Sequence, residues 1–371
     1  MLFALSEEQA ELSGMVRDLL RKRSDSPAVR AAVGMPRGYD ESLWSVLCQQ
    51  VGAAALAIPE EYGGAGFTLF ETHVVLEELG AALTPSPLLG SGVLAAQALL
   101  LAGDEAACAD LLPGIAAGTS VAALVWSGHD GRWSTDGFAV CAIERDGAWT
   151  LDGAAAYVLD GDHADVLVVL AQSPSGPALF RVDPHQPGVR RTASPTMDQT
   201  IRLATVDLEA AEAEILSADA GTFLATLRDV ACSAVSALQV GAAQRCLDLT
   251  VAYTKERVQF GRPIGSFQAL KHRMADMLVE VETARSASWA AAWSAAHRDG
   301  DLPARAATAK AWCSEALSKV AAETVQLHGG IAITWEHDAQ LYFKRAHATA
   351  QLFGGPHEHR RRLERLYGLT G

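Results

Sequence analysis

The spacing of hydrophobic residues changes character twice along this chain, and that change constrains the fold more than any other feature. Apolar residues first recur at helical spacing, then form short β-rich runs between turn residues, and finally return to helical spacing in long segments. This order predicts a mainly α protein with a central β-domain. We expect an N-terminal helical domain over residues 1–118, a β-domain over 119–217 and a C-terminal helical bundle over 218–371.

The β-rich part predicts a small antiparallel barrel or sandwich, because its short runs alternate with Asp-Gly, Ser-Gly and Pro-Gly turns. The expected strands are Val121–Trp126, Phe138–Ile143, Val166–Ala171, Ala178–Val182 and Arg202–Leu208.

The C-terminal part predicts three long helices. The first ends near Val258, the second begins with Ser266 as its N-cap, and the third runs from Pro303 to His328. Small residues on the apolar stripes favour a bundle that also packs against another subunit, so we expect a homo- or hetero-oligomer. At the other end of the chain, Ser6 is predicted to cap the first helix.

Composition narrows the classes of partner. The chain is 49% hydrophobic but only 6% aromatic, which suits closely packed helices, and its net charge is −14. A nucleic-acid partner is not expected, because phosphate binding needs a basic surface. The six cysteines form no CxxC pair, so we predict buried free thiols in a reducing compartment and no metal site.

Targeting signals are also not expected. The first residues are followed at once by Ser-Glu-Glu, unlike a signal peptide, and the most apolar stretch, residues 90–103, is too short to span a membrane. The sequence predicts a soluble cytoplasmic protein.

One peptide carries the chemistry of a diphosphate site. Arg257 offers a planar, permanently charged donor, Phe260 offers a flat face for a base, and Gly261 lets the backbone pass close to a ligand. Taken alone, the peptide is more typical of a helix end that has a solvated Arg257 and a core Phe260.

A second peptide, Gln326-Leu327-His328-Gly329-Gly330, follows about sixty residues later. Its presence favours the ligand-binding interpretation of the first peptide. With Gln268, the stretch 58–64 (IPEEYGG) and the order of the domains, the two peptides resemble the acyl-CoA dehydrogenase family. The resemblance implies that Arg257, Phe260 and Gln268 contact the adenosine diphosphate half of FAD across a dimer interface. It implies that Gln326, Gly329 and Gly330 hold the same half from the other side.

The resemblance also locates residues for the flavin ring. Trp126 and Ser127, in the stretch 122–131, match a loop that the family brings to the isoalloxazine. Tyr157 matches an aromatic contact, whereas Leu159 stands where the family has a hydroxyl. The alternative for this segment is an ordinary strand pair with Tyr157 in the core.

The usual catalytic base of the family is missing. Removal of a proton α to a thioester needs a carboxylate, but Gly354 stands at the usual position of the Glu and Ala231 at the alternative one. Glu358 and Asp229 are the remaining candidates. His357 and His359 also titrate in a suitable range, and both are expected at the surface.

The resemblance implies a subunit of an FAD-dependent acyl-CoA dehydrogenase, acting on an acyl-CoA or related thioester and passing electrons to an electron-transfer flavoprotein. It is closest to actinobacterial members acting on steroid or other bulky acyl-CoAs. Some of those form α2β2 heterotetramers, in which one subunit lacks the base. A non-catalytic partner subunit is therefore the alternative. A third interpretation is different flavin chemistry on the same fold, such as oxidation by O2.

Overall fold

The computed structural model describes residues 4–128, 132–133 and 138–369, and the chain forms two compact units. Unit 1 comprises residues 1–30, 73–84 and 232–371, and unit 2 comprises residues 31–72 and 85–231. This grouping combines the elements differently from the three sequence segments, so the three-domain division stays a prediction.

The helices before the sheet are shorter than the long helices after it, and side-chain caps set the starts of α1, α3 and α6. Ser6 Oγ accepts a hydrogen bond of 3.2 Å from Gln9 N, and Gln9 Oε1 accepts one of 3.0 Å from Ser6 N. This reciprocal pair satisfies two otherwise unpaired amides and confirms Ser6 as the cap. The helices are α1 (Glu7–Arg23), α2 (Ser26–Val33), α3 (Glu41–Val46), α4 (Leu69–Ala82), α5 (Ala96–Ala102) and α6 (Glu105–Ala116), with π-helical turns at Leu47–Val51 and Leu88–Ala95.

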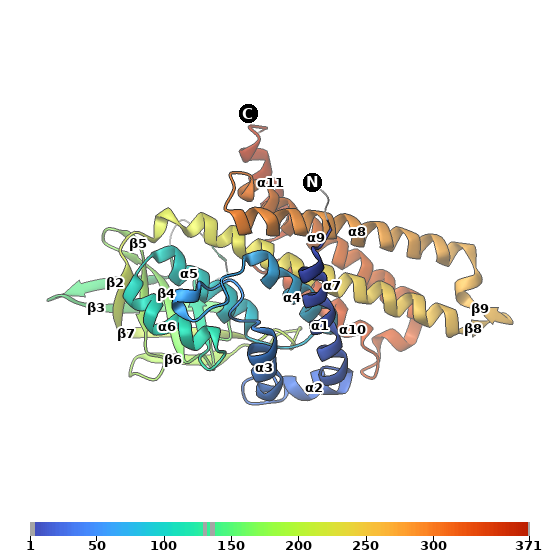
Figure 1. Cartoon of the computed structure of the whole chain (residues 1–371), viewed down its shortest axis with the longest axis horizontal. Helices are drawn as coiled ribbons and strands as arrows, with labels where there is room; N and C mark the ends of the chain where they lie inside the picture. The colour runs from blue at the N-terminus through green and yellow to red at the C-terminus, as the bar shows by residue number, and fades with distance from the viewer. Residues whose placement is uncertain (1–3, 129–131, 134–137, 370–371) are drawn as a thin grey trace. The chain divides into compact units, whose positions relative to one another are not determined.

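Unit 2 contains a seven-stranded sheet (Figure 1). Its strands are β1 (Ala122–Val125), β2 (Val140–Arg145), β3 (Ala148–Leu159), β4 (Val166–Ser173), β5 (Gly176–Val182), β6 (Val189–Ala193) and β7 (Leu203–Ser217). The order β1-β4-β2-β3-β7-β5, with a further β4–β5 pairing, closes β4, β2, β3, β7 and β5 into a ring. A barrel-like β-domain is thereby confirmed.

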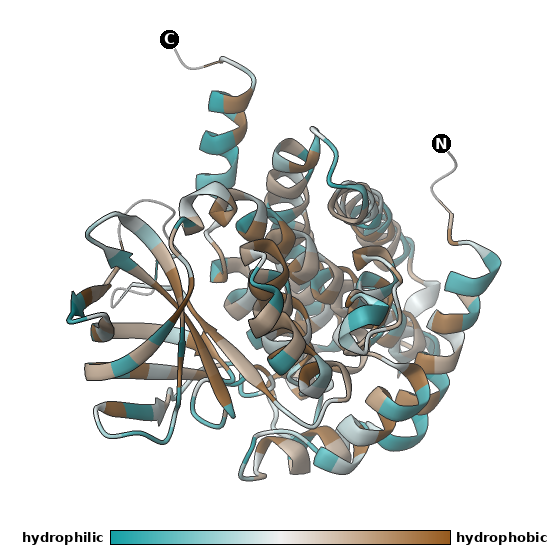
Figure 2. Ribbon diagram, turned by 60° about the vertical axis from the view of Figure 1, so that its left-hand side comes forward, coloured by the Kyte–Doolittle hydropathy of each residue, from teal (hydrophilic) through white to brown (hydrophobic). Residues whose placement is uncertain are grey.

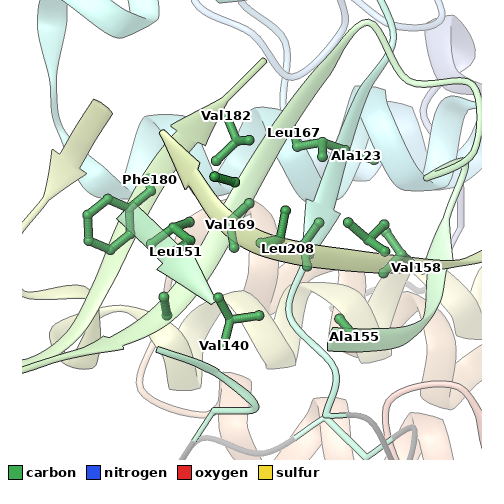
Figure 3. Close-up of a cluster of buried hydrophobic side chains, with 14 of the residues drawn as sticks. Ala123, Val140, Leu151, Ala155, Val158, Leu167, Val169, Phe180, Val182 and Leu208 are labelled. Carbon is green, nitrogen blue, oxygen red and sulfur yellow. The ribbon is translucent and has the colours of Figure 1, made fainter. Parts of the chain in front are cut away.

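Two features of this sheet differ from the sequence expectation. Strand β6 was not expected, and β3 was considered only as the alternative for the segment around Tyr157; β3 is the central partner of both β2 and β7. The sheet is also mixed rather than antiparallel, because β1 pairs with β4 in parallel. Alternating residues fill the interior of the barrel, where Leu151, Val169 and Phe180 are completely buried (Figure 3).

Unit 1 is built on long helices that run alongside one another (Figure 1). They are α7 (Leu224–Glu256), whose residues 224–231 belong to unit 2, α8 (Gln268–His297) and α9 (Leu302–His328). The shorter helices α10 (Ala339–Gln351) and α11 (Pro356–Leu366) follow, and a small hairpin of β8 (Val258–Gln259) and β9 (Arg262–Pro263) lies between α7 and α8. The three long helices are confirmed. Ser266 is not the N-cap of α8, because it lies in a 3-10 turn and its hydroxyl donates to Pro263 O at 2.7 Å; Phe267 takes that position.

Hydrophobic packing of small side chains holds unit 1 together. Val240, Ala284 and Cys313 pack from α7, α8 and α9, and Val281 and Leu317 are completely buried beside them. In Figure 2, α11 is mainly hydrophilic, in keeping with its run of arginines. Within the described residues, no helix has the length and apolar character that a membrane crossing requires. Five of the six cysteines are buried free thiols, whereas Cys141 is exposed.

Candidate functional site

The β8–β9 hairpin of unit 1 presents an aromatic side chain to solvent. Phe260 and Gly261 occupy its tip with φ of 51° and 76°, the signs expected for a type I′ turn. A positive φ is strained for a phenylalanine, and strain of this kind often marks a functional position. The Phe260 side chain is 91% exposed, so a core position for it is wrong. Its ring meets Phe267 edge-on at 6.1 Å.

The same end of unit 1 holds the other residues predicted for the adenosine diphosphate. Tyr253, in the last turn of α7, stacks at 4.4 Å on His328, the last residue of α9. The hairpin peptide and the glycine pair therefore follow helix ends that touch. The predicted contacts that face solvent here are Arg257, Gln268, Gln326, Gly329 and Gly330.

This end of unit 1 has the chemistry of an adenosine diphosphate site. A Cβ atom built on Gly261, Gly329 or Gly330 would meet nothing within 4 Å, so open space lies beside their main-chain groups. An arginine, two amide side chains and an exposed aromatic ring suit a diphosphate and an adenine. The residues present therefore fit that half of FAD.

The residues predicted for the flavin ring lie in unit 2. Trp126 and Ser127 follow β1 and are buried, and the Ser127 hydroxyl donates to Ala156 O. Tyr157 lies at an irregularity of β3 with φ of 56° and is 44% exposed, so it is not a core residue. Irregularities of this kind redirect side chains next to active sites. Residues 129–131 of the predicted loop lie outside the described residues.

The turn between α10 and α11 also has an unusual backbone conformation. Phe353 and Gly354 both have left-handed φ, of 59° and 100°. Completely buried Lys310 of α9 donates to Gly354 O and Ala350 O at 2.9 Å each, and to Ser314 Oγ at 3.1 Å. Burial lowers the pKa of Lys310 to about 8.

Lys310 is a residue that the sequence interpretation missed. It lies on the helical stripe that contains Ala306, Ser314 and Leu317, which are all buried. A single lysine on an otherwise apolar or small-residue stripe was the available signal, because a buried charge needs specific partners.

The candidate proton acceptors differ sharply in accessibility. The Glu358 side chain is 53% exposed, and its Oε1 lies 3.8 Å from Nε2 of exposed His357. Asp229 is buried with its carboxylate 3.9 Å from Arg228 Nε, and Ala231 is fully buried on α7.

His359 does not lie at the surface, contrary to expectation. It is buried, and its Nε2 lies 2.9 Å from Phe353 O and 3.8 Å from Cys232 Sγ. The ring is therefore packed against the same turn that Lys310 holds.

Unit 1 also contains a cleft of about 940 Å³ that none of the predicted site residues lines. Its walls include the ion pair between Arg17 and Glu78, at 2.6 Å, and the pair between Arg285 and Glu77. The charges within each of these two pairs neutralise one another.

Comparison with known proteins gives consistent matches over the whole chain. Residues 6–119 match the acyl-CoA dehydrogenase N-terminal domain, and residues 230–364 match the acyl-CoA dehydrogenase C-terminal domain. The acyl-CoA dehydrogenase IpdE2 of Mycolicibacterium smegmatis is 46% identical over 97% of this chain and 99% of its own length.

Solved structures agree with these matches. The ChsE4-ChsE5 complex of Mycobacterium tuberculosis contains a chain that is 30% identical, with a TM-score of 0.90 over 100% of both chains. A variant of the Tcur3481-Tcur3483 steroid ACAD contains one that is 33% identical, with a TM-score of 0.89 over 98% of both. The order of the elements, the barrel-like sheet and these matches lead to one conclusion: the chain belongs to the acyl-CoA dehydrogenase family.

Proposed function

We propose that this chain is a subunit of an FAD-dependent acyl-CoA dehydrogenase that introduces an α,β double bond into an acyl thioester. The proposal rests on one end of unit 1. There, Phe260 is exposed at the strained tip of the β8–β9 hairpin, three residues after Arg257. The glycine pair there borders open space. These features serve no evident purpose in the packing of the chain itself, and they fit a nucleotide.

Each group of residues has a proposed task. Arg257 would hold the diphosphate of FAD, Phe260 would lie against the adenine, and Gln268, Gln326, Gly329 and Gly330 would complete that half of the site. Trp126, Ser127 and Tyr157 would contact the ring. When bound, FAD supplies the acceptor for the hydride that leaves the β-carbon of the thioester.

The substrate and partners are proposed from the relatives. One structural neighbour is described as a steroid ACAD variant, and another as a complex of two different chains. These descriptions support a bulky acyl-CoA as substrate and a hetero-oligomer, a dimer or an α2β2 tetramer, as the assembly. An electron-transfer flavoprotein is the proposed electron acceptor.

The alternative is a non-catalytic partner subunit of such an assembly. Two observations favour it: neither Gly354 nor Ala231 can accept a proton, and Leu159 offers no hydroxyl to the flavin. In that case the chain would stabilise its partner, and its FAD contacts would serve the flavin of that partner.

The test is purification of the chain alone and together with a co-expressed candidate partner. The proposal expects a yellow protein with one FAD per protomer, whose flavin bleaches anaerobically with an acyl-CoA from a panel of straight-chain and steroid side-chain thioesters. A colourless chain that binds no added FAD in either form would overturn the proposal. A chain that binds FAD but never bleaches would favour the non-catalytic subunit.

A further inference from the structure

Two titratable side chains, Glu358 and His359, crowd Gly354 in the turn after α10. A Cβ atom built on Gly354 would lie 3.0 Å from Glu358 Oε2 and 3.1 Å from His359 Nε2. Contacts this short are tighter than nearly all real Cβ contacts. The carboxylate of Glu358 therefore lies where a side chain of residue 354 would begin, although it comes from the next helix.

Glu358 lies close to Gly354 and is accessible to solvent. It lies in the first turn of α11. Its side chain is half exposed, so a molecule arriving from solvent can reach it. Asp229, the other candidate carboxylate, is buried against its own helix neighbour.

Two buried polar side chains, Lys310 and His359, contact the main chain of the turn before Glu358, although burying a charged group is unfavourable. Lys310 directs hydrogen bonds to Ala350 O and Gly354 O, both of this turn or the helix end before it. His359 contacts Phe353 O from α11. Three main-chain oxygens around one left-handed turn are thus fixed by two buried side chains.

We propose that Glu358 is the proton acceptor of this chain, and that Lys310 and His359 are positioning residues that fix the turn beside it; this inference rests on the proposed dehydrogenase function. The carboxylate takes a proton from the α-carbon of a thioester. The Cα–H bond breaks, an O–H bond forms on Glu358, and the electron pair of the broken bond stays with the thioester as its enolate.

The experiment isolates this proton transfer from the redox reaction. Phenylacetyl-CoA has acidic α-protons and a ring carbon without hydrogen at the β-position, so no hydride can leave it. The FAD-loaded chain, with its partner if one is required for FAD binding, is incubated with phenylacetyl-CoA in D2O. Mass spectrometry then measures the uptake of deuterium at the α-carbon, and absorbance measures bound FAD independently.

Four proteins are compared: wild type, Glu358→Gln, Glu358→Asp and the matched control Glu364→Gln, which changes an exposed carboxylate on the same helix. General-base catalysis contributes roughly 10²- to 10⁴-fold, so Glu358→Gln should slow exchange by about that factor. Glu364→Gln should exchange at the wild-type rate. Glu358→Asp keeps the carboxylate on a shorter side chain and should retain part of the exchange. Partial exchange in this variant would show that the slow exchange of Glu358→Gln does not result from misfolding.

The outcomes separate this inference from the proposed function. Equal exchange by wild type and Glu358→Gln overturns the role of Glu358 and leaves the dehydrogenase function intact. Bound FAD without exchange in the wild type overturns the inference and supports the non-catalytic subunit. A wild type that neither binds FAD nor exchanges protons overturns the proposed function, and this inference with it.

Discussion

The ammonium group of Lys310 lies 2.9 Å from the main-chain oxygen of Gly354, and Lys310 is completely buried. The pair joins the middle of α9 to a turn that has two consecutive left-handed residues. A lysine in this position contributes little through hydrophobic packing. We expect Lys310 mainly to limit the flexibility of this turn and of the neighbouring residues.

We predict that Lys310→Met destabilises the protein and loosens this turn. The variant leaves the buried oxygen of Ala350 and the partly buried oxygen of Gly354 without this donor, and an unsatisfied buried group costs about 1–3 kcal/mol. Urea denaturation should show that loss, and hydrogen exchange should become faster in residues 352–359. Lys22→Met, at the exposed end of α1, is the control and should change neither measurement. Unchanged exchange in the turn of Lys310→Met would contradict the positioning role.

Gly354→Ala should also be destabilising, because φ is 100° there and the new Cβ would press on Glu358 and His359. A left-handed conformation alone costs a non-glycine residue roughly 1–2 kcal/mol. Gly300→Ala is the control, since its Cβ would meet nothing within 4 Å and its φ is not left-handed. Equal melting temperatures of the two variants would show that the turn relaxes easily. A Gly354→Glu variant must be compared with Gly354→Ala for the same reason.

FAD occupancy is predicted to depend on Arg257. Loss of a hydrogen bond to a charged group costs about 1.5–3 kcal/mol, so Arg257→Ala should weaken FAD affinity by roughly ten- to a hundredfold. Titration of the apoprotein with FAD, followed by flavin fluorescence, measures this directly. Arg145→Ala, at the exposed end of β2, should bind FAD like the wild type. Identical affinities of the Arg257 and Arg145 variants would remove Arg257 from the site.

The long helices could be predicted from the sequence because their signal is local and repeats over many turns. The β3 strand could not, because Gly153 and the alanines after it have low strand propensity. Its conformation is imposed from both sides by the ladders to β2 and β7. The parallel pairing of β1 with β4 is likewise a contact between distant segments, which local spacing does not encode.

In the candidate site, too, some features could be predicted from local sequence and others depend on contacts between distant segments. The residue types at Arg257, Phe260 and the glycine pair were visible in short peptides, and the structure adds the exposure of Phe260 and the strain at the hairpin tip. Lys310 and Gly354 are far apart in the sequence, and their contact depends on how α9 meets the end of α10. The Glu358 carboxylate lies close to Gly354 because the turn between them has left-handed residues. The spacing of hydrophobic residues in the sequence does not predict such a turn.

We predict that the protein is not a monomer. Apolar side chains remain exposed along α8 and α9, at Leu278, Val279, Trp293 and Trp312. Contiguous exposed apolar residues are typical of interaction surfaces. Analytical ultracentrifugation should find a dimer or larger species that persists on dilution, and Val279→Asp should weaken it. Thr222→Asp, which changes an exposed polar residue outside these helices, is the control; a monomeric wild type would contradict the prediction.

His73 is a buried titratable group of unit 1 that none of these roles uses. Its Nε2 lies 2.9 Å from Ser288 Oγ, and Ser288 Oγ lies 2.7 Å from Ser236 Oγ, so a chain of polar groups crosses the helices. Burial lowers the pKa of His73 from 6.5 to about 3. The folded protein therefore keeps this imidazole neutral over a range in which the unfolded chain takes up a proton.

This difference predicts acid sensitivity with a defined sign. Above pH 6.5 both states hold a neutral His73 and the group adds no pH dependence; as the pH falls from 6.5 towards 3, only the unfolded state binds the proton, so stability is lost progressively. The free energy of unfolding, measured by urea denaturation between pH 7.5 and 4.5, should therefore fall less steeply in His73→Gln than in wild type. His185→Gln, at an exposed position, should keep the wild-type slope. If His73→Gln and wild type lose stability in parallel, His73 is protonated in the folded state and its environment is more polar than its burial implies.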